Sequence, residues 1–245
     1  MGLKFAVGGL EKCSFIDFPG ALSAVVFTRG CNLRCGYCHN PALISCEPGA
    51  AAGAGGGGGG ADAFLDAEAV LRFLAARRGL LGGVVVTGGE PTLQPDLDGF
   101  IERVRALGFC VKLDTNGTRP EVLAGLLARG RLDYVALDYK DLPEDYAALT
   151  AMREPPRVLG ESLALLRQGG VPFELRTTVV WPHHGEARLR QMAGALRPGE
   201  RWFLQRFRPG QVLDAAAPFQ VPDEGELGRI AQALAREFSL GCAVR

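Results

Sequence analysis

The sequence carries no net charge, because 27 lysines and arginines are balanced by 27 aspartates and glutamates. Without an overall positive field the chain has no general attraction for nucleic acid, so we expect no nucleic-acid partner, although a local basic patch remains compatible with this balance. No apolar run approaches the length of a membrane span, and the first residues, MGLKFAVGGLEKCSF, lack the apolar core of a signal peptide. We therefore expect a cytoplasmic protein that does not bind membranes.

The chain also lacks the even set of cysteines that a disulfide framework needs, since it has seven. Three of them, Cys31, Cys35 and Cys38, form the pattern CxxxCxxC. The other four have no ligand-like spacing, and we expect small buried side chains or free thiols: Cys13, Cys46, Cys110 and Cys242.

The clustered cysteines are better suited to an iron–sulfur cluster than to zinc. A structural zinc site needs four protein ligands, and the sequence has no second CxxC pair to complete one. His39 and Cys46 are conceivable fourth ligands, but a histidine directly after a ligating cysteine is poorly placed to reach the same ion. Three thiolates on a four-iron cluster would leave one iron open, and an open metal position is typical of a catalytic site.

One segment, at about residues 47–62, is almost entirely glycine and alanine and is expected to be a flexible loop within a single domain of residues 1–245. On both sides of it, short apolar segments alternate with amphipathic ones. Strands are expected at 21–30, 83–90, 109–117, 133–140, 171–180 and 201–209. Helices are expected from Asp66, from Pro95, after a capping box formed by Thr118 and Glu121, through Leu159–Leu166, from about Glu186 and from Asp223.

Six strand–helix units in alternation predict an α/β fold with a mostly parallel sheet, which could be doubly wound or barrel-like. Polar residues cluster at the carboxyl ends of four of the strands, at Arg29, Glu90, Asp114 and Lys140. Reactive groups collected from the carboxyl ends of many strands favour a barrel that converges on one site. With six units instead of eight, we expect a partial, open (β/α)6 TIM-like barrel.

Two motifs connect the cysteines to a known family. Tyr37 precedes the last cysteine of CxxxCxxC, and the second expected strand ends in TGGEP. With these motifs the sequence resembles the radical S-adenosylmethionine (radical SAM) superfamily. The resemblance implies one [4Fe–4S] cluster on the three cysteines, with S-adenosyl-L-methionine at the open iron. It also places Tyr37, Gly88, Gly89 and Glu90 at this cofactor, with Glu90 beside its amino group, as expected for a carboxylate facing an ammonium.

A longer segment, FIDFPGALSAVVFTRGCNLRCGYCHNPAL, resembles the activating proteins of anaerobic ribonucleoside-triphosphate reductase, and so do DTNG, LDYK and ELRTTVV. This resemblance implies that Arg176 meets the carboxylate of the cofactor, that Gln205 lies near its ribose and that Lys140 is close by. Asp114, Thr115 and Asp138 correspond to residues that bind a monovalent cation in a related activating enzyme, and both aspartates are also expected at the cofactor.

The resemblance implies an anaerobic oxidoreductase that cleaves S-adenosylmethionine reductively to a 5′-deoxyadenosyl radical and installs a glycyl radical on a partner enzyme. A flavodoxin or a ferredoxin would donate the electron. One alternative is a radical SAM enzyme that modifies a small molecule or a peptide. A further alternative is a non-enzymatic iron–sulfur or zinc module.

Simpler interpretations remain open for several residues. Asp17 could cap a turn as well as touch a substrate. Asn116 fits an ordinary Asn-Gly turn, and Arg176 could pair with a structural acid. His183 and His184 are expected to be exposed loop residues and not metal ligands.

Overall fold

The computed structural model describes residues 2–45, 66–152 and 157–245. The glycine- and alanine-rich segment at 47–62 and Cys46 therefore lie outside the described residues.

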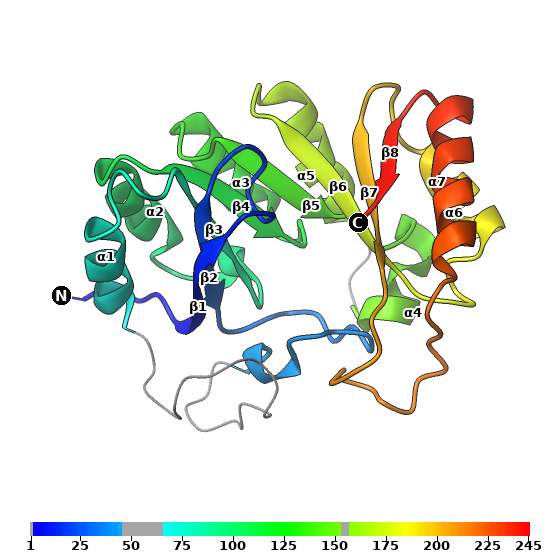
Figure 1. Ribbon diagram of the computed structural model, residues 1–245, viewed down its shortest axis with the longest axis horizontal. Coiled ribbons are helices and arrows are strands. Elements are labelled where there is room, and N and C mark those ends of the chain that lie inside the picture. The colour runs from blue at the N-terminus through cyan, green and yellow to red at the C-terminus, as the bar shows by residue number, and fades with distance from the viewer. Residues whose placement is uncertain (1, 46–65, 153–156) are drawn as a thin grey trace. The chain divides into compact units, whose positions relative to one another are not determined.

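An open sheet of eight strands forms the framework (Figure 1). The strands are β1 (Val7–Ser14), β2 (Ser23–Thr28), β3 (Gly83–Gly88), β4 (Cys110–Thr115), β5 (Tyr134–Asp138), β6 (Phe173–Val179), β7 (Arg201–Arg206) and β8 (Gly241–Val244). The α-helices are α1 (Ala67–Ala75), α2 (Leu97–Ala106), α3 (Pro120–Ala128), α4 (Tyr146–Thr150), α5 (Arg157–Gln168), α6 (Glu186–Gly194) and α7 (Glu224–Glu237). Short 3₁₀ turns are η1 (Pro41–Leu43), η2 (Pro91–Leu93) and η3 (Pro143–Asp145).

The order of the strands in the sheet is their order in the chain, from β1 to β8. A doubly wound sheet reverses its strand order at a switch point, whereas a barrel-type sheet adds each strand next to the previous one. β2 and β3 pair in parallel, as do β3 and β4, β6 and β7, and β7 and β8, while β1 runs antiparallel to β2. This topology confirms the predicted open, TIM-like α/β fold.

The six predicted strands are all present, but the sequence pattern did not predict β1 and β8. β1 reads VGGLEKCS and is largely exposed, and β8 is only four residues long. Edge strands have one partner and little buried surface, so they lack the apolar run that identifies an inner strand.

The chain forms two compact units. The first contains the described residues within 1–32, 42–135 and 158–172, and the second contains the described residues within 33–41, 136–157 and 173–245.

In the first unit, the inner strands are buried on both faces. Val84 and Val86 of β3 are completely buried, and so is Val85, whose side chain points to the opposite face of the sheet. On that opposite face Val85 packs in a cluster with Phe18, Val25 and Tyr134. The helices bury one apolar side each, through Val70, Leu71 and Leu74 of α1, Phe100, Ile101 and Val104 of α2, and Leu123 and Leu126 of α3.

One of two helix caps that the sequence predicts in the first unit is present in the structure. Asp66 caps α1 by accepting a hydrogen bond from the Glu68 amide, as predicted. The capping box predicted for α3 is wrong, because the helix starts after Arg119 and no side chain caps it. The Thr118 hydroxyl instead donates to Asn116 Oδ1 at 2.7 Å. A different local hydrogen bond has therefore replaced the capping box.

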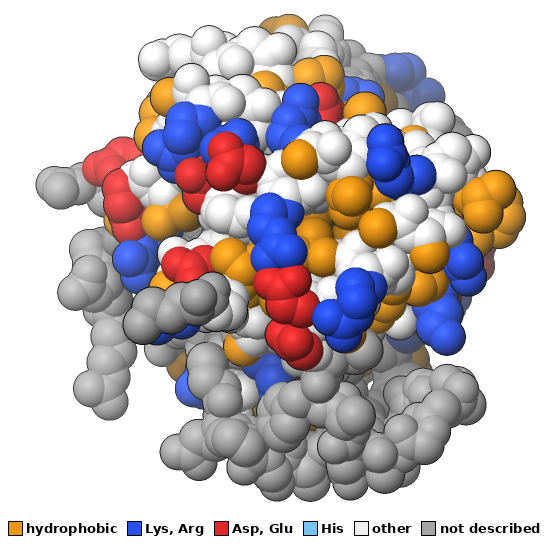
Figure 2. All heavy atoms as spheres, turned by 90° about the vertical axis from the view of Figure 1, so that its left-hand side faces the viewer, with side chains coloured by type: hydrophobic (Ala, Val, Ile, Leu, Met, Phe, Trp, Pro, Cys, Tyr) orange, Lys and Arg blue, Asp and Glu red, His pale blue; other side chains and the backbone are white. Residues whose placement is uncertain are grey.

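Charged side chains of both signs are interspersed on the face that Figure 2 presents. Arg103 of α2 pairs with Glu68 of α1, and Arg131 pairs with Asp98 at 2.8 Å and with Glu102 at 2.6 Å. On the part of this face formed by described residues, neither sign dominates, in keeping with the balanced composition.

In the second unit, α7 lies alongside β8 (Figure 1) and buries Leu227, Ile230 and Leu234. Trp202 of β7 is also buried, and its indole N–H donates to the Thr177 hydroxyl of β6 at 2.8 Å. Within the described ranges, no helix combines the length and the apolar character needed to cross a bilayer.

Candidate active site

The three clustered cysteines follow β2, and none of them forms a disulfide bond. Cys31 belongs to the first unit, where its amide donates to the carbonyl of Ile44 at 3.1 Å. Cys35 and Cys38 belong to the second unit and share one tight turn, in which the Cys38 amide donates to the Cys35 carbonyl at 2.9 Å. Burial raises the pKa of the Cys35 thiol, and the nearby Lys140 ammonium opposes this effect.

Residues 207–220 form a strap against the second half of the cysteine loop. The Asp214 amide donates to the Gly36 carbonyl at 2.9 Å, and Phe219 meets the ring of Tyr37 edge-on, with ring centres 5.9 Å apart. His39 Nε2 lies 2.9 Å from the carbonyl oxygen of Arg208. One ring nitrogen of His39, which the sequence analysis considered as a zinc ligand, therefore contacts the main chain of the strap.

The two glycines of TGGEP allow two backbones to approach closely. A Cβ atom on Gly88 would lie 2.3 Å from the Thr28 nitrogen, and one on Gly89 would lie 2.2 Å from the Gly30 oxygen. Gly88 also has a φ angle of +115°, which side chains rarely adopt. The glycines thus bring the end of β3 against the start of the cysteine loop, where the Glu90 amide donates to the Gly30 carbonyl at 2.7 Å.

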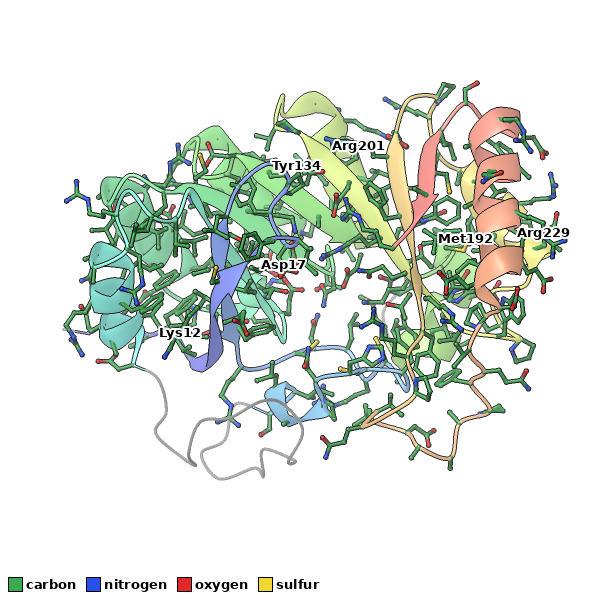
Figure 3. All side chains as sticks on the ribbon, in the orientation of Figure 1. Lys12, Asp17, Tyr134, Met192, Arg201 and Arg229 are labelled. Carbon is green, nitrogen blue, oxygen red and sulfur yellow. The ribbon has the colours of Figure 1, made fainter. Side chains whose placement is uncertain are left out.

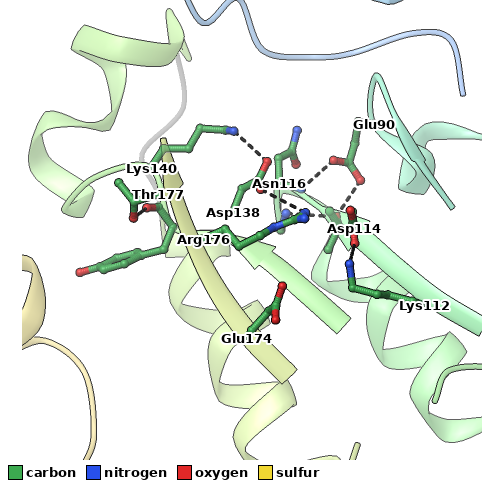
Figure 4. A network of polar contacts seen from close by, with 12 residues as sticks. Glu90, Lys112, Asp114, Asn116, Asp138, Lys140, Glu174, Arg176 and Thr177 are labelled. Carbon is green, nitrogen blue, oxygen red and sulfur yellow. Dashed lines mark hydrogen bonds and ion pairs between the residues drawn. The ribbon is translucent and has the colours of Figure 1, made fainter. Parts of the chain in front are cut away.

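The carboxylate of Glu90 is almost completely buried, at 1% exposure, and accepts four hydrogen bonds. Figure 4 shows it beside one of its partners, Asn116. Oε1 accepts from the amide and hydroxyl of Thr92, at 3.1 and 2.6 Å, and from the Thr115 hydroxyl at 2.7 Å. Oε2 accepts from the Asn116 amide at 2.7 Å. Burial raises the pKa of Glu90, and these hydrogen bonds oppose it. The side chain therefore ties η2 to the end of β4.

The loop after β4 also holds the cysteine loop, through a residue that the sequence analysis missed. Asn32, next to Cys31, accepts from Asn116 Nδ2 at 3.0 Å and donates to the Thr118 hydroxyl at 2.9 Å. Asn116 is therefore more than a turn residue. The sequence contains one signal for Asn32, which is its place directly after a cysteine of the motif. The partners of Asn32 are more than 80 residues away in the chain.

The residues expected to bind a monovalent cation are divided between the units. In the first unit, Asp114 Oδ1 accepts from the buried ammonium of Lys112 at 2.6 Å, and Thr115 is bound to Glu90. Asp138 lies in the second unit. The cation therefore stays a prediction.

In the second unit, charged groups gather at the end of β5 (Figure 4). Lys140 Nζ lies 2.8 Å from Asp138 Oδ2, and Arg176 Nη2 lies 3.7 Å from Asp138 Oδ1. Burial alone would lower the pKa of Lys140, but Asp138, Tyr37 and Cys35 raise it well above its usual range, so the ammonium is retained.

Two predicted residues have less distinctive surroundings. Gln205 lies on β7, half-buried, opposite Thr178 of β6. Asp17 lies in the turn between β1 and β2 (Figure 3), where its carboxylate accepts from the Ser14 hydroxyl and its amide donates to the same oxygen. These bonds fit the turn-capping interpretation of Asp17.

The expectation that His183 and His184 are both exposed is wrong for His184, which is completely buried. Its Nδ1 accepts from the Val180 amide at 3.1 Å, and its Nε2 lies 2.9 Å from the Lys140 carbonyl. His183 is half-buried and contacts Asp141. The adjacent cis peptide bond joins Trp181 and Pro182.

The three cysteines, the glycine-rich end of β3 and the charged groups at the end of β5 all lie within a range that a family model matches. The model of the radical SAM superfamily aligns with residues 25–196. The chain belongs to the radical SAM superfamily. Membership implies a [4Fe–4S] cluster and S-adenosylmethionine.

Relatives of this radical SAM protein include a Methanocaldococcus jannaschii protein provisionally named a glycyl-radical enzyme activating enzyme, 32% identical over 240 residues, which cover 94% of this chain and 93% of that one. The pyruvate formate-lyase-activating enzyme of Clostridium pasteurianum is 31% identical over 180 residues, 71% of this chain and 68% of that one. Streptococcus suis SuiB bound to its precursor peptide SuiA superposes with a TM-score of 0.61 at 17% identity over 90% of this chain. This radical SAM chain spans only 48% of SuiB, and at that identity the likeness concerns the fold alone.

The residues present fit the implied groups. Cysteine sulfurs are the donors that iron–sulfur clusters take, and none of the three in the motif is tied up in a disulfide bond. The Tyr37 hydroxyl is buried and has no hydrogen-bond partner among the described residues, and burial raises the pKa of this phenol well above its usual range. A buried polar atom without a partner is costly in the protein alone, which fits a position beside a bound group.

Proposed function

We propose that this chain cleaves S-adenosylmethionine reductively at a [4Fe–4S] cluster held by Cys31, Cys35 and Cys38, and that it installs a glycyl radical on a partner enzyme. The partner would be an anaerobic ribonucleoside-triphosphate reductase or a related glycyl-radical enzyme. A flavodoxin or a ferredoxin would supply the electron in an anaerobic cytoplasm.

The observation that carries the proposal is the similarity to an activating-enzyme relative along nearly the whole chain. A likeness confined to the cysteine motif would support the cofactor chemistry but would say nothing of the substrate. Because the similarity extends through β6 and beyond, it includes parts of the chain that do not hold the cluster.

When bound, the cluster and S-adenosylmethionine supply one-electron cleavage of a carbon–sulfur bond to a 5′-deoxyadenosyl radical. The protein's own residues would bind and orient S-adenosylmethionine. The Lys140 ammonium and the Arg176 guanidinium share Asp138 and offer positive charge for the carboxylate of the cofactor. Glu90, Gly88 and Gly89 hold the end of β3 against the cysteine loop. The buried Tyr37 hydroxyl would lie beside the bound cofactor.

The cluster assignment is tested by alanine variants of single cysteines after anaerobic reconstitution. Cys31→Ala, Cys35→Ala and Cys38→Ala are each expected to abolish the cluster, measured as iron and sulfide per chain. Cys110→Ala is the matched control, because that thiol is free and exposed and has no ligand-like spacing. Full cluster content in Cys35→Ala, or one zinc per chain without visible absorption, would reject the assignment.

The substrate assignment is tested by electron paramagnetic resonance. Reduced protein, S-adenosylmethionine and the candidate reductase are mixed without oxygen, and a doublet from a glycine α-hydrogen is expected. Changing that glycine of the reductase to alanine should remove the signal. Formation of 5′-deoxyadenosine without a glycyl signal from any such partner would favour a small molecule or a peptide as the substrate.

A further inference from the structure

The buried imidazole of His184 connects the ends of two strands in the second unit. Its Nδ1 accepts the amide proton of Val180 at 3.1 Å, so this nitrogen carries no proton. Its Nε2 lies 2.9 Å from the Lys140 carbonyl oxygen, which can only accept, so this nitrogen carries the proton. Geometry thus requires a neutral ring of one tautomer, and burial lowers the pKa of His184 to about 4 in agreement.

The main chain around Lys140 is held from both sides. The Tyr139 amide donates to the Arg176 carbonyl at 2.8 Å, and the Tyr139 carbonyl accepts from the Thr177 hydroxyl. His184 holds the next carbonyl, that of Lys140 itself. These bonds fix the backbone from which the Lys140 side chain extends to Asp138.

Contacts of the Asp141 side chain fix the segment that carries His184. The Asp141 side chain is completely buried and accepts from the Leu142 amide and from Arg188 Nε, both at 2.7 Å, and it contacts His183 Nε2. Arg188 extends from α6, so the carboxylate ties the segment after β5 to the start of that helix. Residues 180–188 therefore hold residues 140–142 through several independent bonds.

The same cluster has the composition of a metal site, since ligand atoms of Asp141, His183 and His184 lie within 4.8 Å of one another. Its bonding argues against a metal. Both nitrogens of His184 are engaged by the backbone, and the guanidinium of Arg188 lies on the Asp141 carboxylate. A cation would have to displace hydrogen bonds that the protein already makes.

We propose that His184 is a positioning residue that holds the Lys140 carbonyl and thereby presents the Lys140 ammonium, paired with Asp138, to the carboxylate of bound S-adenosylmethionine. This inference rests on the proposed function, which assigns Lys140 to the cofactor. Both ring nitrogens of His184 are bonded to the main chain, at Val180 and Lys140, so the proposed effect on the cofactor passes through Lys140.

The test measures the affinity of the reconstituted protein for S-adenosylmethionine by calorimetry, with iron and sulfide determined in each sample. His184→Phe keeps an aromatic ring but removes both hydrogen bonds, and we expect it to bind about tenfold more weakly at unchanged cluster content, as is typical when an orienting partner is lost. His184→Gln keeps one donor and one acceptor and should lose less affinity than His184→Phe. Arg190→Met is the control and should keep the wild-type affinity, because Arg190 of α6 pairs with Glu186 and Glu237 and takes no part in holding residues 140–142.

A double-mutant cycle with Lys140→Met separates positioning from general damage. If His184 acts through Lys140, changing His184 should have no further effect on affinity once the ammonium is gone. Should His184→Phe fail to fold, His184→Gln takes its place in both backgrounds. A loss of affinity that persists in the Lys140→Met background would overturn the inference, and so would wild-type affinity in His184→Phe.

The same measurements distinguish a failure of the proposed function from a failure of the His184 inference. If the wild-type protein with a full cluster binds no S-adenosylmethionine, both the function and the inference are rejected. If it binds the cofactor but Lys140→Met binds equally well, the inference is rejected while the cluster chemistry remains.

Discussion

Replacing Glu90 by glutamine is expected to lower the free energy of unfolding by about 2–4 kcal/mol. The substitution keeps the size and shape of the side chain and changes one carboxylate oxygen to an amide nitrogen, which cannot accept. In the structure each oxygen of Glu90 accepts from one backbone amide, that of Thr92 on Oε1 and that of Asn116 on Oε2. Whichever way the amide is turned, one buried N–H group loses its acceptor.

The magnitude follows from this geometry. Threonine hydroxyls can rotate and adapt to an amide, so Thr92 and Thr115 need not lose their bonds, but a backbone N–H cannot. An unpaired buried donor costs about 1–3 kcal/mol, and loss of the negative charge weakens the bonds that remain. In a chain of this size the combined effect corresponds to a fall in Tm of roughly 5–15 °C.

The assay is thermal unfolding of the anaerobically purified protein, followed by scanning fluorimetry at neutral pH. Glu68→Gln is the matched control, since Glu68 lies on the surface and pairs with Arg103, and it should change Tm little. Equal Tm values for Glu90→Gln and Glu68→Gln would refute the structural role of Glu90. Its remaining role would then be that of a cofactor contact.

Two further predictions concern the second unit. Gly36→Ala would place a Cβ atom 3.0 Å from the Phe219 ring and push the strap away, so we expect the cluster to lose its visible absorption faster in air. The control is Gly210→Ala, because nothing lies within 4 Å of a Cβ atom at that position. Equal bleaching rates in the two variants would show that the strap does not shield the cluster. The second prediction concerns His184, whose pKa of about 4 in the folded protein lies below the ordinary value of 6.5. Between pH 6.5 and pH 4 the unfolded state takes up a proton that the folded state does not. The free energy of unfolding therefore falls as the pH is lowered across this range. The loss reaches roughly 3 kcal/mol near pH 4, and urea unfolding at a series of pH values should show this component in the wild type but not in His184→Gln; identical pH profiles would contradict it.

The strands could be predicted because the inner ones are apolar and bounded by turn residues. GVVVTG and SAVVFT are buried along nearly their whole length, so their apolar runs identify them without any partner. β1 has two glycines and mainly exposed side chains, and it is a strand because β2 pairs with it. No local signal in the sequence contains that information.

Prediction of the candidate site was limited in the same way. Glu90, Lys140 and Arg176 could be named because they follow or lie within recognisable strands and belong to motifs. Which groups each of them contacts could not be named. Glu90 was expected to meet a ligand, and the structure surrounds it with four donors of the protein itself. A motif shows that a residue is needed, whereas its partners depend on how the strands are brought together.

Glu90 and His184 solve the same physical problem in the two units. Where a parallel sheet ends, the backbone N–H and C=O groups beyond the last paired residues still need partners when they are buried. Glu90, after β3, supplies an acceptor for the Asn116 amide after β4, across 26 residues of sequence. His184, after β6, supplies a donor for the Lys140 carbonyl after β5, across 44 residues. Each bond holds a loop that carries a candidate cofactor residue, so the rigidity of these loops comes from buried polar side chains whose partners are main-chain atoms. The TGGEP motif singles out Glu90 but not its main-chain partners, and no motif singles out His184, which is why sequence reasoning placed His184 at the surface.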